Sequence, residues 1–180
     1  MSDTVLTGTA PHETDSAAPT LAATPAARTY ADVTAVRATD PGAIERAWAT
    51  RTTRPTVRGN GRLMIVAADH PARGALSVGS NATAMNSRTD LLDRLRTALA
   101  NPGVDGVLAT ADILDDLVLL GALEDKVVFS SMNRGGLAGS SFELDDRMTG
   151  ATAASTAKAR MNGAKMLNRV ALDAIGAKAD

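Results

Sequence analysis

The sequence contains no cysteine, and aromatic residues make up only 2% of its 180 residues. Without cysteine, disulfides, thiolate metal sites and cysteine nucleophiles are all excluded. So few aromatic side chains argue against a platform on which nucleic-acid bases would stack. A formal net charge of -1 offers neither a nucleic acid nor a membrane surface a strong electrostatic attraction. We therefore expect a partner that is a small molecule, and neither nucleic acid nor membrane.

Long apolar segments are also missing from the sequence. No apolar run approaches the roughly 20 residues that cross a bilayer. The N-terminus lacks the basic and then apolar segments of a secretory signal. With only two histidines, His12 and His70, a transition-metal site is not expected. These absences favour a cytoplasmic protein without a metal or other cofactor.

The chain divides into a tail and one domain. Residues 1–39 are rich in small and polar side chains, which bury too little surface to offset the entropy of ordering, so we predict a disordered tail. Residues 40–180 form the domain, and its first helix is predicted after Pro41, with Trp48 on its apolar face. The basic run that follows, from Arg51 to Arg62, is predicted to be a solvated linker.

The most function-like stretch is RLMIVAADHPARG, residues 62–74. The uninterrupted apolar run from Leu63 to Ala68 predicts a strand that is buried on both faces of a parallel sheet. Asp69 and His70 follow this strand, and Arg73 comes three residues later. Parallel α/β folds carry their chemistry at the carboxyl ends of strands, so we predict a site here.

Helices and strands alternate after this first strand. Helices are predicted at residues 90–100, 112–123 and 152–161, and strands at residues 106–110, 126–131 and 164–170. This alternation implies right-handed crossovers and a parallel sheet. Two architectures fit the pattern, namely a doubly wound open sheet and a (β/α)8 barrel.

Polar residues also lie in or after the later strands. Lys165 is flanked by apolar residues, and an unpaired ammonium is costly to bury, so we expect it to face a carboxylate such as Asp69 or a polar cavity. Alternatively, it begins the strand and reaches solvent. Asn133 and Arg134 open a glycine-rich loop of a kind that suits a phosphate or carboxylate group.

Five segments carry a resemblance to a known family: MIVAADHPARG, RTDLLDRL, PGVDGVLAT, DKVVFSSMNRGGLAG and GAKML. They resemble the deoxyribose-phosphate aldolase-like (β/α)8 proteins of actinobacteria, relatives of the class I aldolases that act on fructose or tagatose bisphosphate. The resemblance covers about residues 40–169. It implies a TIM barrel of which only the first four β/α units are present.

The resemblance also implies an activity. The chain would be a lyase that acts through a Schiff base and an enamine. Its substrate would be a sugar, expected to be phosphorylated, or a related carbonyl compound. Asp69 would assist proton transfer, and Lys165 would lie beside the substrate. The substrate would be oriented by four further residues, His70, Arg73, Asn133 and Arg134. Because the usual Schiff-base lysine belongs to a sixth strand, we expect a truncated chain.

Two alternatives stand beside this reading. A non-catalytic half-barrel would expose the edges of its first and fourth strands, and it would associate with itself as a homo-oligomer. The second alternative, an open-sheet nucleotide-binding domain, is supported only by the glycine-rich loop at residues 135 and 136.

Overall fold

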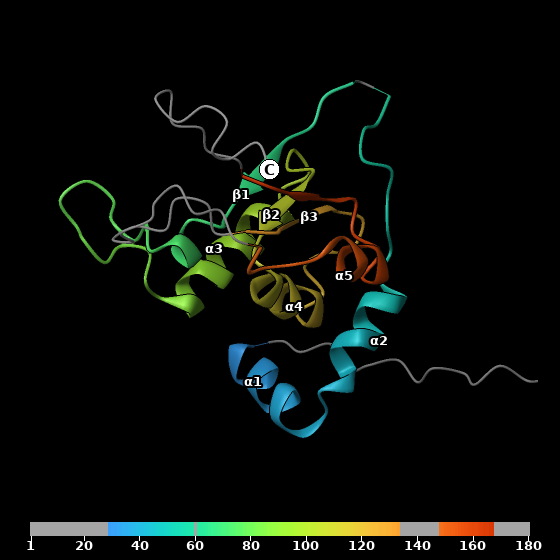
Figure 1. Cartoon of the computed structure of the whole chain (residues 1–180), viewed down its shortest axis with the longest axis horizontal. Helices are drawn as coiled ribbons and strands as arrows, with labels where there is room; N and C mark the ends of the chain where they lie inside the picture. The colour runs from blue at the N-terminus through green and yellow to red at the C-terminus, as the bar shows by residue number, and fades with distance from the viewer. Residues whose placement is uncertain (1–28, 60, 134–147, 168–180) are drawn as a thin grey trace, which may run out of the picture.

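The computed structural model describes residues 29–59, 61–133 and 148–167, and Figure 1 shows the course of the chain. The helices are α1 (Tyr30–Thr39), α2 (Gly42–Thr50), α3 (Arg88–Ala100), α4 (Ala111–Leu119) and α5 (Ala153–Lys158), with the short 3-10 helix η1 (Pro71–Arg73). The strands are β1 (Ile65–Ala67), β2 (Gly106–Ala109), β3 (Val127–Ser131) and β4 (Gly163–Lys165).

The strands form one parallel sheet in the order β1-β2-β3-β4. Strands that follow one another in the sequence are therefore neighbours in the sheet. The predicted α/β class with a parallel sheet is confirmed. Gly106 allows β2 and β3 to lie close together, because a Cβ atom there would lie 2.0 Å from the carbonyl oxygen of Val127.

The core lies between the sheet and the helices α3 and α4, which cover the same face of the sheet in Figure 1. Alternate strand residues such as Val107 and Val128 point into this core and are fully buried. They meet the leucine stripe of α3, which includes Leu92 and Leu95, and Leu117 of α4. Burying each such side chain stabilises the fold by about 1.5–3 kcal/mol.

The first strand differs from its prediction in length and burial. β1 spans only Ile65–Ala67, and Met64 just before it is 56% exposed. The expectation of burial on both faces is wrong for this strand, because Val66 packs against the core while Ala67, on the other face, is exposed. The predicted fourth strand began at Ala164, whereas β4 is Gly163–Lys165, and residues 168–170 lie outside the described residues.

The last part of the predicted disordered tail is a helix. α1 begins with a capping box formed by Thr29 and Asp32, and its Val33 is buried in a cluster with Leu119 of α4. The composition of this segment is poor in large apolar side chains, but packing and the ion pair of Arg37 with α4 stabilise it. Residues 1–28 lie outside the described residues.

The basic run after α2 is not solvated at its start. The Arg51 side chain is buried, and it donates hydrogen bonds of 3.0–3.2 Å to three carbonyl oxygens, those of Leu123, Lys126 and Arg160. Burial lowers the pKa of its guanidinium, which also lies 5.4 Å from the ring of Trp48. The prediction of a solvated linker is therefore wrong here, because the arginine satisfies backbone oxygens that would otherwise be buried alone.

Candidate functional site

Asp69 and Lys165 come together at the carboxyl edge of the sheet. Asp69 follows β1 by two residues, and Lys165 is the last residue of β4. The Nζ atom of Lys165 donates to the Oδ2 atom of Asp69 over 2.5 Å. The contact that the sequence predicted is present, while the catalytic roles of the two residues stay predictions.

The Asp69 carboxylate is buried, with 2% of the residue exposed, whereas 28% of the Lys165 side chain is exposed. Burial alone would raise the pKa of Asp69. The hydrogen bond from Lys165, together with the nearby charges of Lys165, Arg73 and His70, outweighs burial and holds the pKa below its ordinary value. Asp69 is therefore an ionised hydrogen-bond acceptor at neutral pH.

The turn after β1 brings His70 and Arg73 to the same carboxylate. The Nδ1 atom of His70 lies 3.7 Å from Oδ1 of Asp69, and the Nε atom of Arg73 lies 3.9 Å from Oδ2. Pro71 begins η1, and Gly74 ends it with a φ of 74° that a glycine adopts without strain. The short helix thus turns Arg73 back toward Asp69.

Asn133 has its side chain bound to the backbone beyond β4. Its Oδ1 atom accepts from the Leu167 amide over 2.9 Å, and its Nδ2 atom donates to the Leu167 carbonyl over 2.7 Å. Asn133 therefore fixes the chain two residues after Lys165, which is a positioning role. Its role in substrate binding stays a prediction, and Arg134 lies outside the described residues.

Two hollows open near the carboxyl ends of the strands. One, of about 280 Å³, is lined in part by Thr110, Ser131 and Asn133. The other, of about 300 Å³, lies between the turn after β1 and the starts of α3 and α4, with Pro71 and Arg88 in its wall. These volumes are at the lower end of those that hold small molecules.

Ser131 was not singled out from the sequence. It is the register partner of Lys165 in the sheet, and only 4% of its surface is exposed. Its Oγ atom donates a hydrogen bond to the carbonyl oxygen of Asn133 over 3.1 Å. A polar residue that ends a buried apolar strand is a signal that would have indicated it.

The described residues contain neither a cluster of metal-binding side chains nor a membrane-spanning helix. In residues 29–59, 61–133 and 148–167 no group of three or more histidine, aspartate or glutamate side chains is placed to hold a metal ion. None of the helices in these segments has the length and apolar character of a membrane span.

Comparison with known proteins identifies the family. The profile of the Cgl0159-like family matches residues 61–179. The chain belongs to the Cgl0159-like family. It is similar to the crystal structure of Cgl0159 from Corynebacterium glutamicum (Brevibacterium flavum), with 50% sequence identity and a TM-score of 0.73. That similarity covers 75% of this chain and 46% of the Cgl0159 chain, and no curated protein matches.

This family corrects the resemblance to class I aldolases. The matched profile is that of the Cgl0159-like family, and no aldolase family matches the chain. Assignment to the deoxyribose-phosphate aldolase-like proteins was therefore wrong. Short apolar strands that end in a charged residue recur throughout parallel α/β proteins, because such folds place their polar groups at strand ends.

Proposed function

We propose that the chain carries part of the active site of a carbon–carbon lyase that acts on a carbonyl compound. The observation that carries this proposal is the 2.5 Å contact between Asp69 and Lys165 at the carboxyl edge of the sheet. A buried carboxylate beside an ammonium group supplies a proton acceptor and a proton donor within reach of one substrate. Carbonyl chemistry needs both.

In this mechanism Asp69 accepts the proton of the substrate hydroxyl group. The bond between the carbon that bears this hydroxyl and its neighbour then breaks, and the electron pair moves onto the substrate carbonyl. Lys165 stabilises the negative charge that develops on the carbonyl oxygen. Alternatively, Lys165 condenses with the carbonyl, releases water, and receives the electron pair as an enamine. The ion pair with Asp69 favours the first role, because an ammonium group has no lone pair for attack.

We also propose that the four β/α units are the first part of a (β/α)8 barrel. Doubly wound sheets reverse their strand order at a switch point, whereas the described order β1-β2-β3-β4 has no reversal. In a flat sheet β1 and β4 would be about 14 Å apart, so the contact of Asp69 with Lys165 favours a curled sheet. The matched part is less than half of the Cgl0159 chain, which leaves room for further units in that protein.

The surroundings of the pair support a substrate with a negative group. Arg73 and His70 lie within 4 Å of Asp69 and offer nitrogen donors on the same side as Lys165. Such donors suit a phosphate or carboxylate group. A phosphorylated sugar, or a related phosphorylated carbonyl compound, is therefore the proposed substrate class.

A non-catalytic half-barrel that associates with itself is the second candidate. Among the described strands, β1 and β4 each pair on one side only, and such edges favour association with another chain. Light scattering coupled to size-exclusion chromatography separates the two candidates, because an active monomer contradicts the second. The nucleotide-binding alternative depends on glycines 135 and 136, which lie outside the described residues.

The test uses a panel of aldehydes and ketones, each with and without a phosphate group. Exchange of the hydrogen next to the carbonyl is followed by NMR in deuterated water, and borohydride is added in parallel to trap an imine. We expect exchange with a phosphorylated member of the panel. An adduct on Lys165 would assign the enamine route, and exchange without an adduct the polarising route. Absence of both would contradict the proposal.

A further inference from the structure

A further cavity lies on the helical side of the molecule, between α2, α4 and α5. Its volume is about 440 Å³, and none of its lining residues belongs to the Asp69–Lys165 site. Apolar side chains make up most of its wall, including Ile44, Trp48 and Met161. Three ionisable residues also line it, namely Glu45, Asp115 and Lys158.

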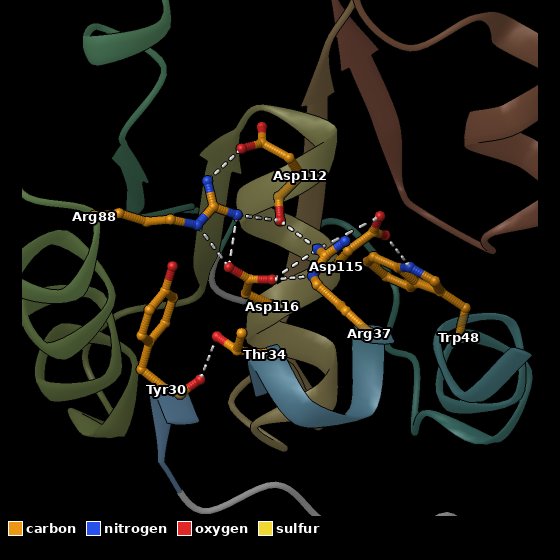
Figure 2. A network of polar contacts seen from close by, with 8 residues as sticks. All are labelled: Tyr30, Thr34, Arg37, Trp48, Arg88, Asp112, Asp115 and Asp116. Carbon is orange, nitrogen blue, oxygen red and sulfur yellow. Dashed lines mark hydrogen bonds and ion pairs between the residues drawn. The ribbon is translucent and has the colours of Figure 1, made fainter. Parts of the chain in front are cut away.

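The charges around α4 do not cancel. Figure 2 shows three carboxylates of this helix, Asp112, Asp115 and Asp116, facing two arginines, Arg37 and Arg88. Arg88 contacts Asp112 over 2.5 Å and Asp116 over 2.6 Å, and Arg37 contacts Asp116 over 2.6 Å. The nearest approach of Arg37 to Asp115 is 4.0 Å. One negative charge is thus left over, and Asp115 is the carboxylate that is least neutralised.

Asp115 is also the carboxylate that faces the cavity. Its Oδ1 atom accepts from the indole Nε1 of Trp48 over 2.8 Å, while the partner of Oδ2 among the described residues is Arg37, at 4.0 Å. Burial raises the pKa of Asp115 despite that hydrogen bond, and the neighbouring Asp116 and Asp112 add to the effect. The two other charged lining residues, Glu45 and Lys158, form an ion pair of 3.0 Å and cancel each other.

We propose that this cavity binds a small organic cation, with its ammonium group on Asp115 and its apolar body against Trp48 and Ile44. An ammonium group would complete the charge balance of the α4 cluster and supply a donor for Oδ2 of Asp115. An aromatic or branched aliphatic body would fill the apolar wall. Neutral ligands lack the first interaction, and anionic ligands would meet an uncompensated carboxylate.

The single tryptophan of the chain makes the test direct. Trp48 lines the cavity, so its fluorescence reports on binding there without a second tryptophan in the signal. The probes are 2-phenylethylamine, the neutral 2-phenylethanol and the anionic 3-phenylpropanoate, each titrated into the protein and repeated by calorimetry. We expect the amine to bind at least about tenfold more tightly than the alcohol, which corresponds to about 1.4 kcal/mol. We expect no binding of the anion.

Matched variants locate the site. Asp115→Asn is expected to lower the affinity for the amine to that for the alcohol. Asp93→Asn removes the same charge from an exposed position on α3 and is expected to leave both affinities unchanged. Ala49→Leu, at an exposed position on the rim of the cavity, is expected to weaken both probes. Circular dichroism verifies that each variant is folded.

Three results would overturn the proposal. The first is equal affinity of the wild-type protein for the amine and the alcohol, which needs no variant and stands even where Asp115→Asn does not fold. The second is amine binding that is unchanged by Asp115→Asn. The third is binding of both probes at full strength in Ala49→Leu.

Discussion

Asp69 and Asp116 are both almost completely buried, with 2% and 1% of their surface exposed, yet their surroundings differ. Asp116 receives four short contacts, of 2.6–2.9 Å, from the Nε and terminal nitrogens of Arg37 and Arg88. Asp69 has one short contact, with Lys165 over 2.5 Å, and two longer ones of 3.7 Å and 3.9 Å. The first carboxylate is saturated with donors, and the second is not.

The cations explain what each carboxylate can do. An arginine fork holds a carboxylate through two nitrogens in a fixed plane, so Arg37 and Arg88 join α1 and α3 to α4 as a rigid unit (Figure 2). Lysine is a compact charge on a flexible stem and can exchange its partner. The Asp116 cluster therefore suits a structural role, whereas the Asp69 pair suits a role in which a substrate replaces one partner.

The largest expected effect comes from Asp69→Asn. The amide keeps the shape of the side chain but cannot accept a proton, so the rate of the proposed carbonyl reaction should fall by about 10³-fold. The free energy of unfolding should fall by only about 1–2 kcal/mol, since Lys165 retains access to solvent. Steady-state kinetics and urea denaturation measure the two effects. A variant with normal activity would show that Asp69 takes no part in the reaction.

The reverse pattern is expected for Asp116→Asn. Arg37 and Arg88 would each lose a 2.6 Å contact with a buried charge, although Arg88 would keep Asp112, and the free energy of unfolding should fall by about 3 kcal/mol. Activity per folded molecule should stay within about twofold of wild type, because Asp116 lies outside the Asp69 site. Urea denaturation followed by circular dichroism gives the stability change. A loss of activity larger than the loss of folded protein would contradict the separation of the two regions.

Acid should remove the stability that the Asp69 carboxylate contributes, which is a smaller effect than those of the two substitutions above. Because the folded state lowers the pKa of Asp69, this group stabilises the protein fully above its unfolded pKa of about 3.9, and the contribution is lost as the pH falls through the folded value. The stability gap between wild type and Asp69→Asn should therefore be constant from pH 5 to 7, then shrink below about pH 4. Thermal melts at a series of pH values measure the gap. A gap that widens toward acid would reverse the predicted sign.

The smallest effect is expected for an exposed ion pair. Arg94 contacts Asp90 over 2.9 Å on the surface of α3, with 76% of the arginine side chain exposed. Arg94→Ala should change the free energy of unfolding by about 0.5 kcal/mol or less, because water and salt screen such pairs. This variant calibrates the two buried clusters in the same urea assay. If Arg94→Ala lowered the free energy of unfolding by several kcal/mol, burial would not explain why the Asp69 and Asp116 contacts matter more than this exposed pair.

Much of the fold was predictable because it depends on local patterns. The stripe of leucines on α3 and the apolar strands β2 and β3 repeat with the periods of helix and strand, and their positions were predicted within about two residues. The meeting of Asp69 with Lys165 was predictable from the cost of burying an unpaired ammonium group. The place of Lys165 was not, because it ends β4, whereas the predicted strand of residues 164–170 put it near the start.

Other features depend on contacts between distant segments. Arg51 reads as solvated in the sequence, but its carbonyl partners lie 72–109 residues away. α1 reads as disordered by composition, and its stability comes from Arg37 reaching Asp116 of α4. Asp116 itself lies between apolar residues of α4, next to Leu117, and this position is a signal of burial in the sequence. The aldolase resemblance was wrong because its segments, short apolar strands that end in polar residues, recur in parallel α/β proteins of many families.

A double-mutant cycle on Asp69 and Lys165 tests the central claim most directly. The rate of hydrogen exchange next to the substrate carbonyl is measured for wild type, Asp69→Asn, Lys165→Met and the double variant. If the two side chains act as one acid–base unit, the double variant is no more than about threefold slower than the slower single variant. If the two losses multiply, the residues act independently, and the proposed pair is contradicted.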